Sequence, residues 1–326
     1  MNSIGLVAIG RNEGQRLRQC LLSVLGKVDL IVYVDSGSTD GSVELARSLG
    51  VDVVELNLSI PFTAARSRNT GLAHLLTARQ IEFVQFVDSD CEVVQEWLER
   101  ASSALNARPE VAVVCGRRRE RFPKLSIYNQ LLDMEWDTPI GETKSCGGDA
   151  MMRVDAFQQV GGFNPTLIAG EEPELCVRLR QKGWKICRLD AEMTLHDAQM
   201  TNFKQWWKRT LRAGHAYTQG AWLHGAAEGH WVRESRSIWF WGLLLPLLVL
   251  GLAWPSHGFS LLLLTGYPVL GSRIFANLVR QNISRQHAFL YAFFCIIGKF
   301  AQAGGALTFL WNQLLGSKNT LIEYKS

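Results

Sequence analysis

Two aspartates one residue apart, Asp88 and Asp90, come directly after a largely apolar run at residues 81–87. A β-branched and aromatic run of this length predicts a buried strand, and the carboxylates that end it predict an opening at the sheet edge. Open α/β sheets bind ligands at the carboxyl ends of their strands. Carboxylates placed there can hold a hard divalent cation, which in turn neutralises a diphosphate. The sequence therefore predicts a metal and diphosphate site after this run.

Polar residues also follow two earlier strand-like runs. Residues 35–42 (DSGSTDGS) come after a strand and open a helix, with Asp40 or Thr39 as the expected N-cap. Their hydroxyls and carboxylates can bind a base or a ribose, or simply form a capped turn. Residues 8–13 (AIGRNE) follow the first strand and fit the same pocket. Neither segment is the G-x-G-x-x-G fingerprint of dinucleotide-binding proteins.

Two arginines lie on the helix predicted ahead of the Asp88 strand. Arg66 and Arg68 are two residues apart, so they cannot share one helical face. We therefore expect at most one of them to point at a phosphate. Either one can instead be a solvated surface charge.

Two downstream segments supply further acids. Residues 146–149 (CGGD) place a tight glycine turn before Asp149, and residues 170–175 (GEEPEL) begin a helix with Pro173 in its first turn. Acids at a helix start can simply complement the helix dipole. Beside a diphosphate site they can also deprotonate a sugar hydroxyl. Displacement at an anomeric carbon needs such a base, and a bound Mg²⁺ or Mn²⁺ neutralises the departing diphosphate.

Strands and helices alternate through the first half of the chain, which predicts an α/β fold with a mainly parallel sheet and right-handed crossovers. We expect an irregular substrate region at 117–162, then a helix at 171–181 and a strand at 184–189. The expected strands are 4–9, 30–34, 51–54, 81–87 and 111–115, and the expected helices are 13–25, 42–49, 64–76 and 94–105.

Charge and cysteine usage exclude some classes of protein. Residues 1–237 carry 28 basic and 29 acidic side chains, so a nucleic-acid-binding surface loses its main support. The seven cysteines are scattered and lack a C-x-x-C pair. They are expected to be reduced and mostly buried, with no metal or catalytic role. No N-terminal signal peptide is expected, because the apolar start is too short.

Three apolar stretches at the C-terminal end predict attachment to a membrane. Residues 238–254 contain no charge and are long enough to span a bilayer, whereas 259–278 and 288–315 are borderline. A buried helical hairpin is the alternative. Basic residues before the first stretch and none directly after it predict a cytoplasmic N-terminal domain. The basic, aromatic segment at residues 203–217 is typical of an interfacial helix, although it can equally be a packing helix.

Six ordered motifs resemble those of the family 2 (GT-A fold) glycosyltransferases, most closely the membrane-attached bacterial members that build exopolysaccharides. The resemblance covers roughly residues 4–215. The motifs are Arg11-Asn12-Glu13, the loop from Asp35 to Gly41, Arg68-Asn69, Asp88-Ser89-Asp90, Gly148-Asp149 and the segment from Gly170 to Leu175.

This resemblance implies an inverting transfer from a nucleotide-diphospho-sugar, with a divalent metal, Mg²⁺ or Mn²⁺. Glu172 would be the base and Asp149 would touch the acceptor or the donor sugar. Asp88 and Asp90 would hold the metal. His196, after a late strand of this fold, would be a further metal ligand or a phosphate contact, with a purely structural histidine as the alternative. The donor would be bound by the following residues: Ala8, Arg11, Glu13, Asp35, Ser36, Arg68 and Asp88.

Three positions depart from the family's pattern. The base position, usually Asp, is Glu172, which leaves Glu171 as an alternative base. Ser36 replaces a second acid, and residues 205–209 (QWWKR) lack the final Trp of the Q-x-x-R-W signature of processive synthases. We therefore expect transfer of single sugars.

The expected protein has a cytoplasmic GT-A catalytic domain at 1–200, an interfacial region at 201–237 and a membrane region at 238–326. It would sit in the inner membrane with the catalytic domain facing the cytoplasm. Its partners would be a nucleotide sugar and a lipid-linked saccharide, and no nucleic acid. We expect a polyprenyl-diphosphate-linked saccharide, because the enzyme itself is held at the bilayer. Two alternatives remain: a processive polysaccharide synthase, and a non-catalytic scaffold that binds a nucleotide sugar.

Overall fold

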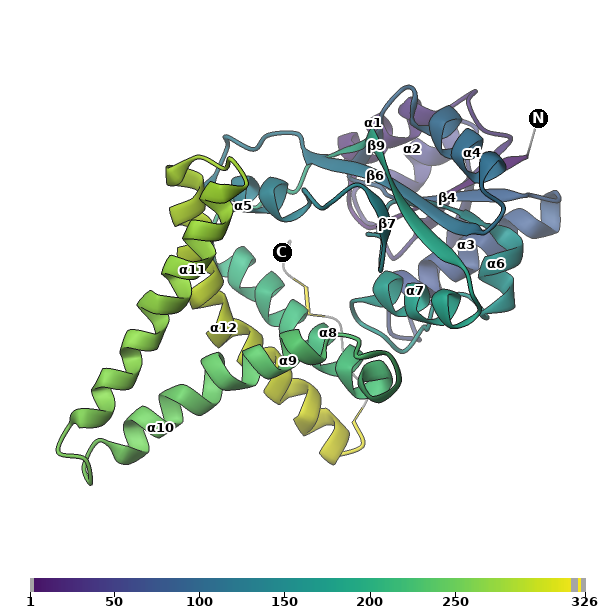
Figure 1. Cartoon of the computed structure of the whole chain (residues 1–326). Coiled ribbons are helices and arrows are strands. Elements are labelled where there is room, and N and C mark those ends of the chain that lie inside the picture. The colour runs from purple at the N-terminus through teal and green to yellow at the C-terminus, as the bar shows by residue number, and fades with distance from the viewer. Residues whose placement is uncertain (1–2, 318–321, 324–326) are drawn as a thin grey trace. The chain divides into compact units, whose positions relative to one another are not determined.

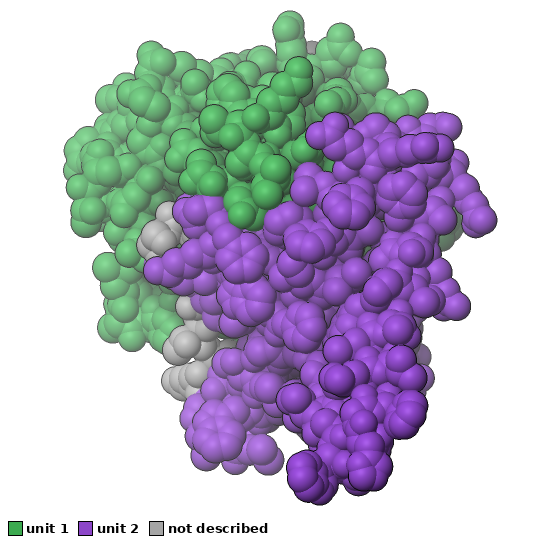
Figure 2. Space-filling model, turned by 90° about the vertical axis from the view of Figure 1, so that its left-hand side faces the viewer, with its two compact units in different colours: residues 1–201 green, residues 202–326 purple. Residues whose placement is uncertain are grey.

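The chain folds into two compact units, residues 1–201 and 202–326, which are coloured separately in Figure 2. They are seen here in a computed structural model that describes residues 3–317 and 322–323. The remaining positions at the end of the expected membrane region, 318–321 and 324–326, lie outside the described residues. The unit boundary lies one residue after the expected end of the catalytic domain.

Unit 1 is built on one mixed, mainly parallel sheet, in the order β3-β2-β1-β4-β8-β6-β9-β5, with β7 paired to β9 (Figure 1). Strands β3, β2, β1 and β4 run parallel to one another, as do β6 and β9, and the other pairs are antiparallel. The strands are β1 (Ile4–Gly10), β2 (Leu30–Asp35), β3 (Asp52–Glu55), β4 (Phe83–Asp88), β5 (Cys91–Val93), β6 (Val111–Glu120), β7 (Gly141–Thr143), β8 (Ala150–Arg153) and β9 (Lys185–His196).

Seven helices connect these strands: α1 (Gly14–Val24), α2 (Ser42–Ser48), α3 (Ala64–Ala78), α4 (Trp97–Ala107), α5 (Ile127–Glu135), α6 (Val154–Gln159) and α7 (Glu171–Gln181). Helix α3 begins where the Thr63 side chain accepts a hydrogen bond from the amide of Arg66. It packs closely on the sheet because Gly71 has no side chain: a Cβ there would lie 2.4 Å from Cγ1 of Val7. This close packing fixes α3, and therefore Arg68, against β1.

The predicted α/β fold is confirmed, but several details differ from the expectation. Strands β7 and β8 lie inside the region that was expected to be irregular. Strand β6 runs on to Glu120 and β9 runs on to His196, because the two strands pair with each other along most of their length. Strand β5 was not expected, and it exists through its antiparallel pairing with the end of β9. Helix α2 begins after Gly41, which has a positive φ of 83°. The side chain of Asp40 still accepts the amide of Ser42, although it does not occupy the N-cap.

All the regular secondary structure described in unit 2 is helical. It consists of α8 (Phe203–Glu228), α9 (Val232–Trp239), the π-helical turn η1 (Phe240–Leu244), α10 (Leu245–Leu252), the 3₁₀ segment η2 (Phe259–Thr265), α11 (Gly266–Arg280) and α12 (Arg285–Leu314). The π turn ends two residues before Pro246, whose missing N–H cannot continue a regular helical ladder.

Three segments of unit 2 are long and apolar enough to cross a membrane: Val232–Leu252, Phe259–Arg280 and Arg285–Leu314. They coincide with the three predicted stretches, and the first begins six residues earlier than expected. Helix α8 instead packs on α12 at glycines. A Cβ at Gly214 would lie 2.1 Å from the backbone oxygen of Gln302, and one at Gly305 would lie 1.9 Å from that of Leu211. The packing interpretation of residues 203–217 is thus supported by close backbone contact.

Candidate active site

The parallel strands bring three of the predicted motifs to one edge of the sheet. Gly10 at the end of β1 is paired with Asp35 of β2, and its neighbour Ile9 is paired with Asp88 of β4. The approach is close, since a Cβ at Gly10 would lie 1.7 Å from the hydroxyl oxygen of Ser89. Only glycine fits there, and the carboxyl ends of β1, β2 and β4 therefore form a single surface.

The loop after β2 is held in shape by Asp35. Its carboxylate accepts the amides of Gly37 and Ser38, both at 2.8 Å, and the hydroxyl of Tyr33 at 2.9 Å. Burial and the nearby Asp35 raise the pKa of Tyr33 well above its ordinary value, so its phenol stays a donor. Asp35 is 2% exposed. The expected nucleoside-binding aspartate therefore forms the loop, and its oxygens are already in use.

Other expected donor-binding residues lie in varied surroundings. Ala8 is fully buried in β1 between β2 and β4, so its methyl group belongs to the core, and the expected donor contact stays a prediction. Arg11 is exposed beyond the strand end, and Glu13 pairs with Arg16 at 2.6 Å. Ser36 is 3% exposed, and its hydroxyl has no hydrogen-bond partner among residues 3–317 and 322–323. An unpaired buried hydroxyl at the sheet edge indicates a place for a ligand atom.

Four charged residues from three elements form what we call the Arg68 cluster: Arg68, Asp88, Glu171 and Glu172. Nη1 of Arg68 lies 2.8 Å from Oε1 of Glu171 and 2.7 Å from Oε1 of Glu172, and Nη2 lies 2.8 Å from Oδ1 of Asp88. The Arg68 side chain is only 2% exposed. Arg66, by contrast, donates to the backbone oxygens of Asn57 and Ile60. Only one of the two arginines faces the site, as predicted.

The acids of the Arg68 cluster differ in their affinity for protons. Burial, and next the neighbouring Glu171, raise the pKa of Glu172 to about 7. Burial would also raise the pKa of Asp88, but Arg68 and Arg118 outweigh it and hold that pKa below its usual value. One guanidinium cannot fully compensate three carboxylates, and Glu172 is the group that retains proton affinity near neutrality. A carboxylate with such a pKa suits a general base.

A second group of residues, which we call the His196 cluster, consists of Asp90, Glu120, Trp136 and His196. Nε2 of His196 lies 3.0 Å from Oδ2 of Asp90, and Nδ1 lies 3.5 Å from Oε2 of Glu120. The ring of Trp136 meets the imidazole edge-on, with centroids 4.9 Å apart and an interplanar angle of 84°. The pairing of β5 with β9 brings His196 opposite Cys91 and hence next to Asp90.

Arg118 of β6 joins the two clusters and was not anticipated from the sequence. Its Nη2 lies 3.0 Å from Oδ2 of Asp88, and its Nε lies 3.5 Å from Oδ2 of Asp149. Its guanidinium stacks 5.0 Å from the centre of the Trp136 ring. Arg118 and Glu120 are two residues apart on one strand, so they share a face. Both Arg118 and Glu120 could have been found from the sequence if the strand predicted at 111–115 had been extended beyond Cys115.

Asp149 is buried beside Asp88. It has no exposed surface, and its oxygens accept the amide of Asp88 at 3.1 Å and the hydroxyl of Thr194 at 2.7 Å. The residue before it is Gly148, where a Cβ would lie 2.7 Å from Nη2 of Arg68. The tight glycine turn is therefore as predicted, but the carboxylate points into the protein. Its surroundings make it a residue that positions Asp88.

The donor atoms at the sheet edge fit a hard divalent cation. Asp90, Cys91 and His196 offer ligand atoms within 4.8 Å of one another. Burial raises the pKa of Cys91 well above its ordinary value, so its thiol stays protonated and is a poor ligand for Mg²⁺ or Mn²⁺. The carboxylates around Arg68 and Arg118 outnumber the two guanidinium groups, which favours a further cation. Carboxylate oxygen and imidazole nitrogen are both ligands that Mn²⁺ accepts.

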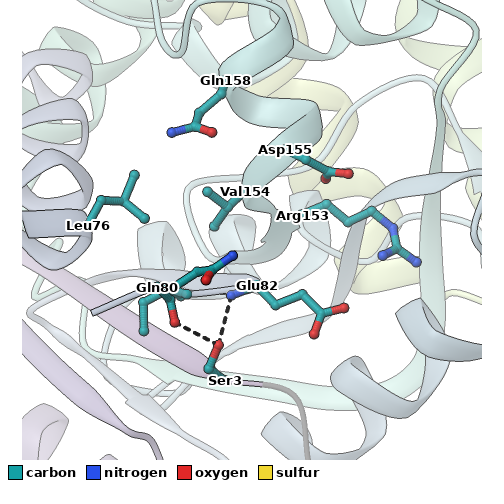
Figure 3. Close-up of a pocket in the computed structure, with 9 residues that line it drawn as sticks. Ser3, Leu76, Gln80, Glu82, Arg153, Val154, Asp155 and Gln158 are labelled. Carbon is teal, nitrogen blue, oxygen red and sulfur yellow. Dashed lines mark hydrogen bonds between the residues drawn. The ribbon is translucent and has the colours of Figure 1, made fainter. Parts of the chain in front are cut away.

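A cavity of about 780 Å³ lies among β4, the start of α6 and the end of α3 (Figure 3). In it the Ser3 hydroxyl donates to the backbone oxygen of Gln80 at 3.0 Å and accepts the amide of Glu82 at 3.1 Å. Glu82 and Arg153 flank the amino end of β4, whereas Asp88 lies at its carboxyl end. This cavity lies at the amino end of β4 and the predicted acids lie at its carboxyl end, so the two are at opposite ends of the strands.

Comparison with known proteins agrees with this geometry. Residues 7–161 match the family described as "Glycosyl transferase family 2", and residues 133–204 match "N-terminal domain of galactosyltransferase". The chain belongs to the family 2 glycosyltransferases. The matched segments together run from the first strand to the beginning of α8.

Two curated relatives of this glycosyltransferase illustrate the similarity. The glycosyltransferase AglE of Haloferax volcanii is 26% identical over 222 residues, covering 64% of this chain and 70% of that protein. The O-antigen chain rhamnosyltransferase WbaN of Salmonella anatum is 25% identical over 224 residues, covering 64% and 69%.

A solved structure shares the fold. It is the mannosyltransferase PcManGT from Pyrobaculum calidifontis in complex with GDP-Man and Mn²⁺, with a TM-score of 0.62 and 16% identity, covering 95% of this chain and 87% of that one.

Proposed function

We propose that this glycosyltransferase moves one sugar from a nucleotide-diphospho-sugar to a lipid-linked, polyprenyl-diphosphate-type saccharide, with inversion at the anomeric carbon. The reaction would take place at the cytoplasmic face of an inner membrane, in the synthesis of an envelope or exopolysaccharide. Residues 1–200 would form the catalytic domain, 201–237 the interfacial region and 238–326 the membrane region. The O-antigen rhamnosyltransferase among the relatives supports a saccharide chain as the acceptor.

The observation that carries the proposal is Glu172 at the first turn of α7, held 2.7 Å from Arg68. In the reaction an acceptor hydroxyl forms a bond to the anomeric carbon from the face opposite the diphosphate. The bond from that carbon to the diphosphate oxygen breaks, and its electron pair leaves with the diphosphate. Glu172 takes the hydroxyl proton in the same step. Arg68 holds the carboxylate in place before and after the transfer.

The donor would lie along the edge formed by β1, β2 and β4. The buried Ser36 hydroxyl and the loop that Asp35 holds face the nucleoside, and Arg11 and Glu13 lie beyond the end of β1. Asp88, Asp90 and His196 would hold a divalent metal, Mg²⁺ or Mn²⁺. When bound, that ion neutralises charge developing on the diphosphate. Arg118, at 3.0 Å from Asp88, fixes the orientation of that carboxylate.

Transfer of single sugars is supported by the use that the structure makes of Gln205. This residue stands where processive synthases have the Gln of their signature. Its side chain accepts the amide of Asn202, and the Asn202 side chain accepts the amide of Gln205, so the two form a capping box at the start of α8. Gln205 therefore has a structural task that explains its presence without a growing polysaccharide.

The test is donor turnover by the detergent-purified full chain across a panel of nucleotide sugars, with and without Mn²⁺. We expect metal-dependent release of the nucleoside diphosphate from one donor, and faster release when a lipid extract containing polyprenyl-linked saccharides is added. Successive elongation of a single acceptor would instead indicate a processive synthase. No release from any donor, with lipid present, would overturn the proposal in favour of a scaffold.

A further inference from the structure

The turn between β6 and α5 exposes three large apolar side chains. Phe122 is 48% exposed, Leu125 is 61% exposed and Ile127 is 43% exposed. Lys124, between them, is also exposed. Exposed apolar residues gathered on one short segment with a basic neighbour are uncommon on a freely soluble surface and mark an interaction site. We call residues 122–127 the 122–127 turn.

The turn is held firmly from inside. The amide of Phe122 donates to Oε1 of Glu120 at 3.1 Å, and its carbonyl accepts the amide of Leu125 at 3.0 Å and the side chain of Asn129 at 3.1 Å. Asn129 has no exposed surface, and Ser126 caps α5 by accepting its amide. The backbone of the turn is therefore fixed, and the apolar side chains cannot be hidden by the turn folding inward.

We propose that the 122–127 turn inserts Phe122, Leu125 and Ile127 into the interfacial region of a lipid bilayer, with Lys124 among the headgroups. The chain supplies the reason for choosing a bilayer as the partner, because it carries three segments long and apolar enough to cross one. A membrane is then always within reach of unit 1. Aromatic and aliphatic side chains beside a lysine suit the boundary between acyl chains and anionic headgroups.

The turn shares a buried carboxylate with the candidate site. Oε1 of Glu120 accepts the amide of Phe122, while Oε2 accepts the amide of Ala198 at 3.2 Å and lies 3.5 Å from Nδ1 of His196. Phe122, the first residue of the turn, is thus two residues along the chain from Glu120 of the His196 cluster. If the proposed lipid-linked acceptor is correct, and this step rests on that proposed function, the turn would hold its lipid near unit 1 so that the acceptor hydroxyl, at the non-reducing end of the saccharide, reaches the donor site.

The first test measures directly how deeply the 122–127 turn enters the bilayer, and it does not depend on enzymatic activity. A nitroxide is attached to Leu125→Cys in the full chain carrying Cys295→Ser, since the other six cysteines are buried. The protein is reconstituted in phosphatidylcholine vesicles with and without phosphatidylglycerol. The matched control is Ser103→Cys on the exposed side of α4, which lies across unit 1 from α5 (Figure 1).

We expect the label at residue 125 to collide several-fold more with dissolved oxygen than with a water-soluble nickel chelate, relative to the label at residue 103. The difference should grow with phosphatidylglycerol, because Lys124 favours anionic headgroups. Equal, aqueous accessibility at both positions would overturn the proposal. So would a label shielded from both reagents in detergent as well as in vesicles, which would indicate a protein partner or a second copy.

A second measurement separates this inference from the proposed function. The double variant Phe122→Ser and Leu125→Ser should raise the KM for a lipid-linked acceptor several-fold, while metal-dependent donor hydrolysis stays unchanged. If the wild-type chain hydrolyses no donor, the proposed function fails and the depth result still stands. An unchanged acceptor KM in an active chain would overturn the role assigned to the turn.

Discussion

The Arg68 cluster and the His196 cluster both bury carboxylates, but they compensate the charge in different ways. In the Arg68 cluster a guanidinium lies within 2.8 Å of oxygens from Asp88, Glu171 and Glu172. In the His196 cluster an imidazole stands between Asp90 at 3.0 Å and Glu120 at 3.5 Å. The guanidinium keeps its charge at every accessible pH, whereas an imidazole can be neutral and can then offer a lone pair.

This difference indicates a division of tasks. The single positive charge of Arg68 faces three carboxylates, so one of them keeps a raised pKa, and Glu172 is that carboxylate. It is therefore suited to accept a proton. The His196 cluster offers carboxylate oxygen and imidazole nitrogen, and it is suited to hold a metal. Arg118 keeps the two functions a fixed distance apart.

The largest effect should come from removing the base. Glu172→Gln keeps the size of the side chain and its contact with Arg68 but cannot accept the proton. We expect the rate of transfer to fall by about 10³-fold, within the usual range for general bases. Steady-state transfer measures the rate, and donor affinity measured by calorimetry should change little.

Glu171→Gln is the matched control, because it removes the neighbouring acid at the same distance from Arg68. Its effect on transfer should be far smaller. If Glu171→Gln lowered the rate of transfer more than Glu172→Gln did, the base would be Glu171 and not Glu172.

The second effect concerns stability. Arg68→Met leaves three buried or half-buried acids without their cation, so the free energy of unfolding should fall by about 3–5 kcal/mol. Denaturant titration of the detergent-purified chain would measure it. Arg66→Met, two residues away on α3, removes only hydrogen bonds to the backbone oxygens of Asn57 and Ile60 and should cost much less. Equal losses would show that Arg68 is not the centre of the cluster.

The sequence predicted the part of the site that follows strand ends directly. Asp88, Asp90 and Glu172 were found because each lies at the end of a periodic apolar run or at the start of a helix. Arg118 and Glu120 were missed, since the alternation on β6 continues through charged residues that resemble a loop. Their faces become clear only once β6 pairs with β9, a contact between segments distant in the sequence.

The same limit applies to the direction in which a motif residue points. Ala8 lies in a family motif, yet its neighbours in β2 and β4 cover it completely. Asp149 also lies in such a motif, but Thr194 and the amide of Asp88 take its oxygens. A motif gives the order of residues along the chain. Which way a carboxylate points depends on tertiary partners that no local pattern contains.

The third effect concerns the metal. Asp90→Asn removes a direct ligand, so we expect the affinity for Mn²⁺ to fall by more than about 100-fold, the upper value for losing an outer partner. Electron paramagnetic resonance of free Mn²⁺ measures this without any turnover. The matched control is Asp155→Asn in the cavity of Figure 3, at the other edge of the sheet. If both variants bound Mn²⁺ as tightly as the wild type, the His196 cluster would not be the metal site.

The fourth effect is a pH dependence that reports on the Arg68 cluster alone. Because the pKa of Glu172 is raised to about 7, kcat/KM should fall about tenfold per pH unit below that value as the base becomes protonated. The same shift affects folding in the opposite sense. A folded-state pKa above the unfolded one stabilises the protein at low pH, and this contribution is lost as the pH rises through about 7.

Glu172→Asp, which restores the residue usual in the family, should still lose kcat/KM as the pH falls. The residual kcat/KM of Glu172→Gln should not show this loss. An unchanged loss at low pH in Glu172→Gln would assign the titration to another group. Stability that rose with pH from 5 to 8 at this position, judged from the difference between wild type and Glu172→Gln, would contradict the raised pKa.

The smallest effect should come from Glu120, which acts on the metal site only through His196. Glu120→Gln keeps an oxygen for the amide of Phe122 but weakens the partner of Nδ1 of His196. We expect about a tenfold loss of Mn²⁺ affinity, the lower value for an outer partner, with transfer recovered at saturating metal. Such recovery distinguishes orientation of a ligand from direct participation. If saturating Mn²⁺ failed to restore transfer while the fold remained intact, Glu120 would have to act on the substrate itself, and the His196 cluster would do more than hold the metal.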